Sequence, residues 1–405
     1  MRVLMLSWDF PPRTTGGTAA HVDGLTKALA TAGHDIVVLT IAERITDVAV
    51  EATPPTAAGG MVRVLRTAVD LPWLPPVDTV ARTASANHAF TKLGAQLATL
   101  LDTDGADGSW RPDIVHGHDW RTGWAADTLS TLFGVPFVLT MHGTERMRHG
   151  GQLPLGDPTD INSIEWWLAF QADRLIAPTQ FMVEQLITGF ELDADHVARI
   201  PNGVDPTYWQ PPADHAVERE PLVLSWGNVQ FEKGFQVLAR SMHLLRGRVP
   251  NVRGVIAGRG SYLPDLQSQI DVEGVSDIVE LPGYVPDGAL RSLAHRAGLV
   301  VIPSLYEPFG IVALEALAAG APLIVARTGG LAELLVDTDA GITFEPGNPE
   351  DLARCIAEVL TDPDRAAGLM SHGRALVEKT YAWDAIAAAT ATVYEGLLTS
   401  THRRD

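Results

Sequence analysis

Short apolar runs that alternate with amphipathic segments constrain the fold of this chain more than any other feature. The clearest case follows the apolar run 298–302. After a turn at 303–310, apolar residues recur at helical spacing over 311–319, and Gly320 stands where a glycine would end the helix. Residues 321–326 then read as a second strand. This order predicts a strand–helix–strand unit of a parallel sheet.

The same alternation runs through both halves of the 405-residue chain, which is too long for one ordinary core. Strands are expected at 2–8, 35–40, 61–67, 112–118, 136–143 and 174–179, and again at 222–226, 252–257, 278–281, 298–302, 321–326 and 342–346. The fold class predicted is α/β, with two Rossmann-like, doubly wound parallel-sheet domains facing a cleft. The domains predicted are 1–205 and 206–384, joined by a proline-rich, charged linker over 206–221.

Composition excludes several classes of function. The net charge of −19 argues against nucleic acid and anionic membrane surfaces as partners. Cys355 is the single cysteine, so there is no intrachain disulfide, which fits a reducing compartment. No signal peptide or membrane-spanning run is evident, and a soluble, cytoplasmic protein is expected.

The turn at 303–310 has the chemistry of an anion site. Unpaired N–H groups at a helix N-terminus carry partial positive charge, and Gly310 allows close approach to the backbone. Glu307 and Glu315 lie about 10–12 Å apart if the intervening residues are helical. Hydrolytic carboxylate pairs stand closer, at roughly 5–9.5 Å, so these two favour separate contacts to one elongated ligand. The alternative is a solvated loop carboxylate and a polar helix residue.

Other strand ends carry weaker signals. Gly16 and Gly17 follow the first strand, but they do not form a dinucleotide fingerprint, which disfavours a nicotinamide enzyme. His116 and His118 share one face of a strand, yet a metal site needs a third ligand and none is evident nearby, so packed histidines are preferred. Lys233 beside a glycine turn is often only a solvated charge.

Several stretches are predicted from local pattern alone. Residues 43–60 and 71–76 read as loops, 80–101 as one long helix, 144–163 as largely irregular, and 164–172 as a helix. The irregular stretch holds polar groups suited to fixing an acceptor. Eight of the ten tryptophans precede residue 210, where most are expected to fill the core.

Two motifs resemble those of family-4 retaining glycosyltransferases, which include bacterial glycogen synthases and share the GT-B fold. Glu307-Pro-Phe-Gly followed by Glu315 resembles the family's Glu-x7-Glu element, and residues 116–120 resemble its His-x-His-Asp-Trp motif. The segment 142–150 resembles one found in actinobacterial α-1,4-glucosyltransferases of the glycogen-synthase type. The resemblance covers nearly the whole chain and implies that the last helix, 385–400, crosses back onto the first domain.

The resemblance implies a role for each candidate residue. His118 would hydrogen-bond the donor sugar, Gly16 and Gly17 would meet the donor diphosphate, and Lys233 would clamp its phosphates. Tyr284 would stack on the nucleotide base, with an ordinary half-buried tyrosine as the alternative. The sequence departs from the family at Asn228, where a second phosphate-clamping arginine is usual, and at Thr15, where classical glycogen synthases have a lysine.

The remaining assignments concern the opening motif and the acceptor. Phe309, Gly310, Ile311 and Val312 would bind the donor, Glu307 the sugar hydroxyls and Glu315 the ribose. His142, Glu145, Arg146 and His149 would bind the acceptor. No metal or other cofactor is expected, because the family's leaving phosphate itself is proposed to act as the base.

The predicted reaction moves a glucosyl unit from ADP-glucose or UDP-glucose to an α-1,4-glucan or a short glucoside, with retention. Two alternatives stay open at this point. The acceptor could be a lipid, an inositol or a natural-product aglycone, because the fold does not determine it. The altered phosphate clamp could also mark a non-catalytic nucleotide-sugar-binding protein.

Overall fold

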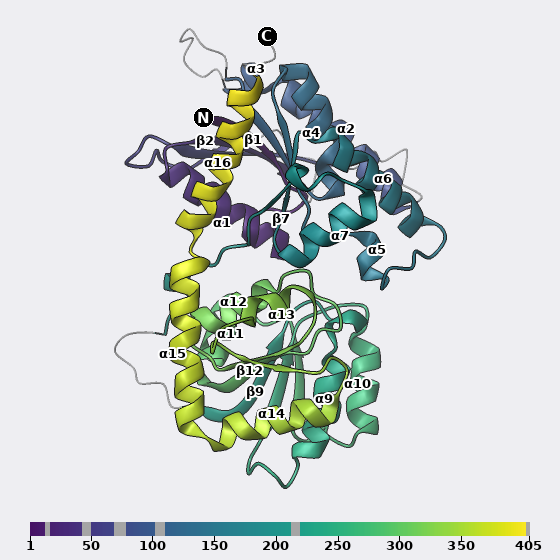
Figure 1. Cartoon of the computed structure of the whole chain (residues 1–405), viewed down its shortest axis with the longest axis vertical. Helices are drawn as coiled ribbons and strands as arrows, with labels where there is room; N and C mark the ends of the chain where they lie inside the picture. The colour runs from purple at the N-terminus through teal and green to yellow at the C-terminus, as the bar shows by residue number, and fades with distance from the viewer. Residues whose placement is uncertain (13–16, 43–49, 69–77, 102–109, 212–218, 402–405) are drawn as a thin grey trace. The chain divides into compact units, whose positions relative to one another are not determined.

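The chain folds into two compact units (Figure 1). Unit 1 comprises Met1–Pro201 and Trp383–Asp405, and unit 2 comprises Asn202–Ala382. The computed structural model describes all residues except 13–16, 43–49, 69–77, 102–109, 212–218 and 402–405. Within these described residues, no helix has both the length and the apolar character needed to cross a bilayer.

Unit 1 is built on an eight-stranded sheet with the order β3-β4-β2-β1-β5-β6-β7-β8. Its strands are β1 (Arg2–Leu6), β2 (Asp35–Ile41), β3 (Val50–Ala52), β4 (Met61–Thr67), β5 (Ile114–His118), β6 (Phe137–Thr140), β7 (Arg174–Ala177) and β8 (Val197–Arg199). All neighbours pair in parallel except β3, which runs antiparallel to β4 at the sheet edge.

Helices cover both faces of this sheet. They are α1 (Gly17–Thr31), α2 (Thr79–Ala95), α3 (Leu97–Leu101), α4 (Trp120–Phe133), α5 (Glu145–Arg148), α6 (Asp157–Gln171), α7 (Gln180–Phe190) and α16 (Trp383–Thr401). The last helix returns to unit 1 and packs along α1 (Figure 1), as expected for the end of the chain. The hydroxyl of Tyr394 on α16 bonds buried His116 at 2.6 Å.

Successive side chains of a strand point to opposite faces of the sheet, and this alternation explains why unit 1 has two hydrophobic clusters. Leu4 and Leu6 of β1 enter one hydrophobic cluster, whereas Val3 and Met5 enter another on the opposite face. All four side chains are fully buried. A parallel strand covered on both faces therefore needs an apolar residue at every position, which is why it reads as a continuous apolar run.

Unit 2 has a six-stranded, entirely parallel sheet with the order β11-β10-β9-β12-β13-β14. Its strands are β9 (Glu220–Trp226), β10 (Arg253–Ala257), β11 (Val279–Gly283), β12 (Ala297–Ile302), β13 (Leu323–Ala326) and β14 (Ile342–Phe344). Its α-helices are α8 (Pro206–Trp209), α9 (Phe235–Leu245), α10 (Leu263–Val272), α11 (Asp287–Arg296), α12 (Ile311–Ala318), α13 (Gly329–Leu335), α14 (Pro349–Thr361) and α15 (Pro363–Thr380).

Each sheet reverses its strand order at one place. In unit 1, β1 lies between β2 and β5; in unit 2, β9 lies between β10 and β12. Ligands of open α/β sheets bind outside the carboxyl ends of the strands at such a point. At these points Gly17 opens α1 and His118 ends β5 in unit 1, and Lys233 and Glu307 lie in the loops after β9 and β12 in unit 2. The candidate residues thus lie where this architecture places a ligand.

Four local predictions were wrong. The stretch 144–163 is not irregular, because α5 occupies part of it and α6 begins at Asp157. The start of α6 was missed because residues 157–163 are mostly polar and offer one buried apolar side chain, Ile161, which is too little to show a helical period. The long helix predicted over 80–101 is two helices that break at residue 96.

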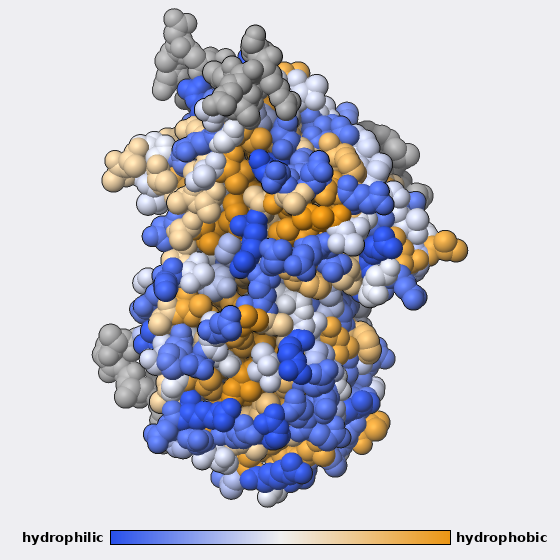
Figure 2. Space-filling model, viewed as in Figure 1, coloured by the Kyte–Doolittle hydropathy of each residue, from blue (hydrophilic) through white to orange (hydrophobic). Residues whose placement is uncertain are grey.

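The other two errors concern loops. Residues 43–60 contain the edge strand β3, whose pairing with β4 no local pattern shows. The supposed linker begins with α8, capped by the Asp205 carboxylate, and Trp209 at its end is buried in the core of unit 2. The predicted excursion at 71–76 lies outside the described residues. The surface shown in Figure 2 intermixes hydrophilic and hydrophobic residues, as on most folded proteins.

Candidate active site

An ion pair joins the two best candidates of unit 2. Lys233 Nζ lies 2.7 Å from Glu307 Oε2, and Ser304 Oγ donates to the same oxygen at 3.3 Å. Both side chains are mostly buried, with 27% of Lys233 and 14% of Glu307 exposed. One ammonium and one carboxylate are therefore placed together at the carboxyl end of the sheet, partly shielded from water.

A close backbone approach explains why these two residues meet. Gly234 has φ of +69°, and a Cβ there would lie 1.9 Å from the carbonyl oxygen of Pro303. Only glycine allows the loops after β9 and β12 to touch at this point. The Leu305 N–H also donates to the Glu232 carbonyl at 2.7 Å. The two loops are thus held together directly beside the ion pair.

The N-terminus of α12 follows Glu307. Gly310 takes φ of +96° as its N-cap residue and offers no side-chain cap, while Ile311 and Val312 are half-buried. Free N–H groups of this kind suit an anionic ligand. The ring of Phe309 is buried against Tyr381 with a centroid distance of 6.2 Å. Phe309 can therefore offer a ligand only its backbone.

Glu315 is separated from Glu307 and has a different partner. The indole Nε1 of Trp226, the last residue of β9, donates to Glu315 Oε2 at 3.1 Å. Burial raises the pKa of Glu315 to about 7, although the Trp226 hydrogen bond opposes that shift. Its carboxyl group is therefore ready to change protonation state near neutral pH. The carboxylates of Glu307 and Glu315 thus have different partners, Lys233 and Trp226.

Tyr284 and Asn228 lie on neighbouring loops of unit 2. Tyr284 follows β11 and is 57% exposed, and the Arg259 guanidinium stands 5.6 Å from its ring centroid. The backbone N–H of Val229 donates to the Arg259 carbonyl at 2.8 Å, which ties the loop of exposed Asn228 to that of Arg259. An exposed aromatic ring next to a cation is available for stacking.

Four histidine rings gather in unit 1. His116 and His118 stack at 4.4 Å, as their shared strand face predicts, and His118 Nδ1 lies 3.2 Å from His142 Nε2. His21 of α1 lies edge-on to His118 and His142, with centroid distances of 5.5 and 4.7 Å. Burial lowers the pKa of His116 to about 3, the pKa of His118 well below its usual value, and the pKa of His142 as well. The imidazoles of His116, His118 and His142 are therefore neutral at physiological pH.

The two inner histidines differ in their hydrogen bonds. His116 uses both ring nitrogens, one with Tyr394 and one with the Thr140 hydroxyl at 2.7 Å. His118 Nε2 is buried and has no hydrogen-bond partner among the described residues. A buried polar atom without a partner costs about 1–3 kcal/mol, so a ligand is the natural partner for it.

Asp119 holds the ends of β5 and β6 together. Its Oδ1 accepts the His142 backbone N–H at 2.8 Å, and its own N–H donates to the Thr140 carbonyl at 2.9 Å. It has φ of +57°, a region that aspartate tolerates better than most residues. These two hydrogen bonds of Asp119 set the position of His142 relative to His118.

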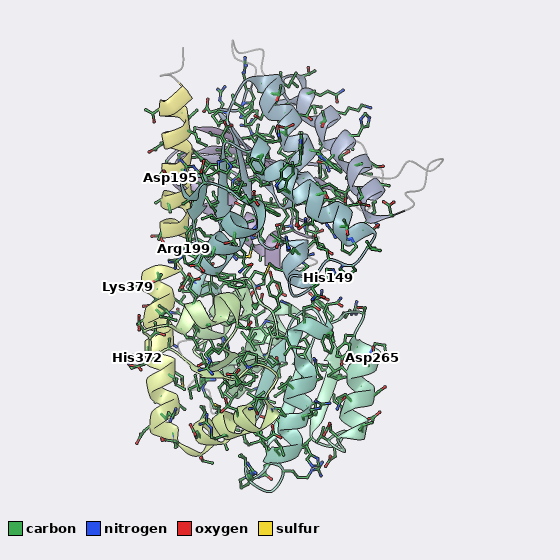
Figure 3. All side chains as sticks on the ribbon, turned by 45° about the vertical axis from the view of Figure 1, so that its right-hand side comes forward. His149, Asp195, Arg199, Asp265, His372 and Lys379 are labelled. Carbon is green, nitrogen blue, oxygen red and sulfur yellow. The ribbon has the colours of Figure 1, made fainter. Side chains whose placement is uncertain are left out.

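The remaining acceptor candidates cluster around the short helix α5. Glu145 Oε1 lies 3.2 Å from His149 Nε2, and Arg148 pairs with the same carboxylate. Both carboxyl oxygens of buried Glu165 lie within hydrogen-bond distance of the Glu145 backbone N–H, at 3.1 and 3.0 Å. Burial raises the pKa of Glu165 to about 8. His149 marks the end of α5 in Figure 3.

A pocket of about 440 Å³ lies beside α5. Exposed Arg146 lines it together with Thr144, and residues of α7 such as Glu184 and Thr188 form its other side. Of the predicted site residues in unit 1, His118 and His142 meet directly, and so do Glu145 and His149. Gly17 opens α1, whereas Gly16 lies outside the described residues.

Comparison with known proteins assigns the family. Residues 15–208 match the model described as Glycosyltransferase Family 4, and residues 210–383 match Glycosyl transferases group 1. The chain is 35% identical over 395 residues to glycogen synthase of Mycobacterium tuberculosis, covering 97% of this chain and 94% of that protein. The chain belongs to glycosyltransferase family 4. It is accordingly a glycosyltransferase of the hexosyltransferase type with the GT-B fold.

Other family members show how wide the range of acceptors is. D-inositol 3-phosphate glycosyltransferase of Arthrobacter is 33% identical over 301 residues, covering 70% of both chains. Among solved structures, sucrose-phosphate synthase from Thermosynechococcus elongatus superposes with a TM-score of 0.81 at 22% identity, covering 98% of this chain and 99% of that one. Family membership therefore leaves the acceptor open.

Sequence reasoning missed several residues that the structure brings into these sites. They are His21, Glu165 and Trp226. His21 carried the one available signal, because it lies beside Val22 on the buried side of a predicted helix. Glu165 and Trp226 gave none, since their partners Glu145 and Glu315 lie 20 and 89 residues away along the chain.

Proposed function

We propose that this family-4 enzyme transfers a glucosyl unit from ADP-glucose or UDP-glucose to the non-reducing end of an α-1,4-glucan or a short glucoside, with retention of configuration. The Lys233–Glu307 pair at the N-terminus of α12 carries the proposal. It offers a cation and free backbone N–H groups for a diphosphate, and a carboxylate for sugar hydroxyls. Similarity to a glycogen synthase along nearly the whole chain supports the glucosyl and glucan assignment.

In this mechanism the protein positions two substrates and stabilises charge on the leaving phosphate. Lys233 and the backbone N–H groups of Gly17 and of residues 310–312 bind the diphosphate. The leaving phosphate takes the proton from the incoming hydroxyl on the same face of the sugar. No side chain acts as a covalent nucleophile, and the reaction is proposed to need no metal.

The donor is held at both ends. His118 Nε2, buried and without a partner among the described residues, hydrogen-bonds the sugar, and Glu307 binds its hydroxyls. Glu315 binds the ribose, and exposed Tyr284 stacks on the base. In this proposal unit 2 is the nucleotide-sugar-binding domain.

The acceptor is assigned to unit 1. His142, Glu145, Arg146 and His149 bind it, and the pocket lined by Arg146 is large enough for a sugar ring. Glu165 supports this region by accepting the Glu145 N–H at the start of α5. The α5 segment thus supplies several polar groups within one short helix.

Two specific observations favour other readings. The similarity to inositol phosphate glycosyltransferases favours an inositol or other non-glucan acceptor. The neutral Asn228, where the family has an arginine, favours a protein that binds nucleotide sugars without transferring them.

One experiment separates the three. The protein is incubated with a panel of nucleotide sugars, with and without maltooligosaccharides or inositol phosphate, and the products are weighed by mass spectrometry. Longer oligosaccharides support glucan synthesis, and a glycosylated inositol phosphate contradicts it. Saturable donor binding with neither transfer nor donor hydrolysis supports the binding protein.

A further inference from the structure

We infer that His21, His118 and His142 form a binding site for Zn²⁺ in unit 1. Each offers one ring nitrogen, and the three ligand atoms lie within 4.8 Å of one another. In a tetrahedral site with Zn–N bonds of about 2.0–2.1 Å, ligand nitrogens stand about 3.3–3.4 Å apart. The observed group is therefore at most about 1.5 Å wider than zinc requires, a difference that small rotations of the rings close.

The ligands come from well-anchored parts of the fold. His21 is buried on α1, His118 ends β5, and His142 follows β6. Asp119 fixes His142 by accepting its backbone N–H, and the two nitrogens that face each other across His118 and His142 are already 3.2 Å apart. A trio held this rigidly is preorganised, which favours metal binding.

The partner of His118 is not the residue that its sequence spacing suggests. His116 has both ring nitrogens occupied by Tyr394 and Thr140, so it cannot serve as a ligand without breaking two buried hydrogen bonds. The sequence shows no third ligand near His118. His21 of α1, about a hundred residues earlier in the chain, supplies it. Strand order, with β1 next to β5, brings it there.

The ligand set selects the kind of metal. Three imidazoles suit Zn²⁺ and neighbouring transition metals, whereas Mg²⁺ and Ca²⁺ require oxygen ligands. Three protein ligands leave one tetrahedral position for water or an anion. We assign the site to Zn²⁺, with Co²⁺ as its spectroscopic substitute.

Zinc at this site has a consequence that rests on the proposed function. His118 is the residue proposed to hydrogen-bond the donor sugar through Nε2, and zinc would bind the same ring through the Nδ1 that faces His142. A zinc ion held there hinders the sugar from taking its place beside His118, so zinc and the donor compete. The site would then be inhibitory and reversible, and separate from the transfer reaction, which needs no metal. Chelation should relieve the inhibition.

The first test measures binding and uses no sugar. Protein without a polyhistidine tag is stripped with a chelator, titrated with Co²⁺, and followed by the visible absorption bands of tetrahedral cobalt. We expect one cobalt ion per chain, displaced by Zn²⁺. His21→Gln should weaken cobalt binding by about a hundredfold or more, since removing even an outer-shell partner costs about 10–100-fold. His88→Gln, at an exposed position on α2 of the same unit, should bind as the wild type does.

Two results overturn the assignment. One is the absence of tetrahedral cobalt bands in the wild type, and the other is unchanged affinity in His21→Gln. Circular dichroism confirms that each variant is folded. If His21→Gln does not fold, His142→Gln tests the same ligand set. Tetrahedral cobalt bands that persist in His142→Gln would equally overturn the assignment.

The second test measures inhibition. Zn²⁺ should reduce glycosyl transfer by the wild type in competition with the nucleotide sugar, and a chelator should restore the rate. The rate of His21→Gln, compared with its own zinc-free rate, should not fall. Cobalt binding without inhibition of transfer would overturn the competition, whereas a failure to find any transfer activity would leave the cobalt result standing and contradict only the proposed function.

Discussion

Lys233 and Glu307 hold each other at 2.7 Å, although 74 residues separate them along the chain. Each side chain therefore holds the other in position. Both are proposed to bind the donor at this place. The Glu307 carboxylate precedes the first residue of α12 by four residues. This relationship makes the pair the most informative place to alter the enzyme.

Glu307→Gln should reduce kcat by about a hundredfold, the order expected for one lost transition-state contact. The amide keeps the size of the side chain but loses the charge that bonds sugar hydroxyls and orients Lys233. Affinity for the bare nucleotide should change little, as measured by calorimetry. Glu315→Gln should do the opposite and mainly weaken nucleotide binding. Equal effects of both variants on nucleotide affinity would show that the two roles are wrongly assigned.

Trp226→Phe should weaken nucleotide binding by removing the N–H that holds Glu315 while keeping an aromatic ring at the end of β9. The pKa of Glu315 is about 7, so wild-type affinity should rise with pH through that value as the carboxylate ionises and accepts ribose hydroxyls more strongly. Without the indole N–H, the midpoint should move to higher pH. In the Glu315→Gln variant, which has no carboxyl group at this position, nucleotide affinity should not show this pH dependence. A midpoint unaffected by Trp226→Phe would contradict this link.

Asn228→Arg should raise kcat by roughly ten- to a hundredfold, since a charged hydrogen bond to phosphate contributes about 1.5–3 kcal/mol. Arg259 stands over the Tyr284 ring, so we expect Arg259→Ala to weaken base binding rather than remove a phosphate contact. Asn228→Gln serves as the uncharged control. A severe loss of kcat in Arg259→Ala, with no gain from Asn228→Arg, would instead show that Arg259 already replaces the missing arginine.

Glu165→Gln should change how stability depends on pH. The pKa of Glu165 is raised from about 4.5 to about 8, so between these values the folded state binds a proton that the unfolded state has released. This residue's contribution to stability is full below the lower value and is lost as pH rises to the upper one. Relative to wild type, Glu165→Gln should therefore be roughly 4 kcal/mol more stable at pH 9 than at pH 5, because about three pKa units of the shift lie in that range and each corresponds to about 1.4 kcal/mol.

Urea unfolding at the two pH values measures this difference. Glu184→Gln, at an exposed position on α7, is the matched control and should show none of the effect. A variant whose stability relative to wild type is the same at pH 5 and pH 9 would show that Glu165 is ionised in the folded protein at both values.

Transfer should survive chelation, because the proposed mechanism assigns phosphate charge to Lys233 and backbone N–H groups rather than to a metal. With EDTA present, the rate should stay the same or rise, the rise being due to removal of inhibitory zinc. The new linkage should be α when the donor is α-linked. A β-linked product by NMR would contradict the same-face mechanism.

Local sequence pattern determined the alternation of strands and helices, and with it two largely parallel sheets at whose strand ends His118, Lys233 and Glu307 lie. This was possible because burial on both faces of a parallel strand demands an apolar run, and because strand ends are marked by glycine and proline turns. Where a helix begins with mostly polar residues, as α6 does over 157–163, the prediction failed.

Only the tertiary structure decided which residues meet. His21 joins His118 and His142, Trp226 binds Glu315, and Glu165 supports α5 because strand order and helix packing bring distant segments together. Local spacing instead paired His118 with His116, whose nitrogens are already used by Thr140 and by Tyr394 of the returning last helix. The sequence alone located the loops at the strand ends. Which side chains contact one another in those loops was decided by long-range packing, because contacts between distant segments depend on sheet topology rather than on separation along the chain.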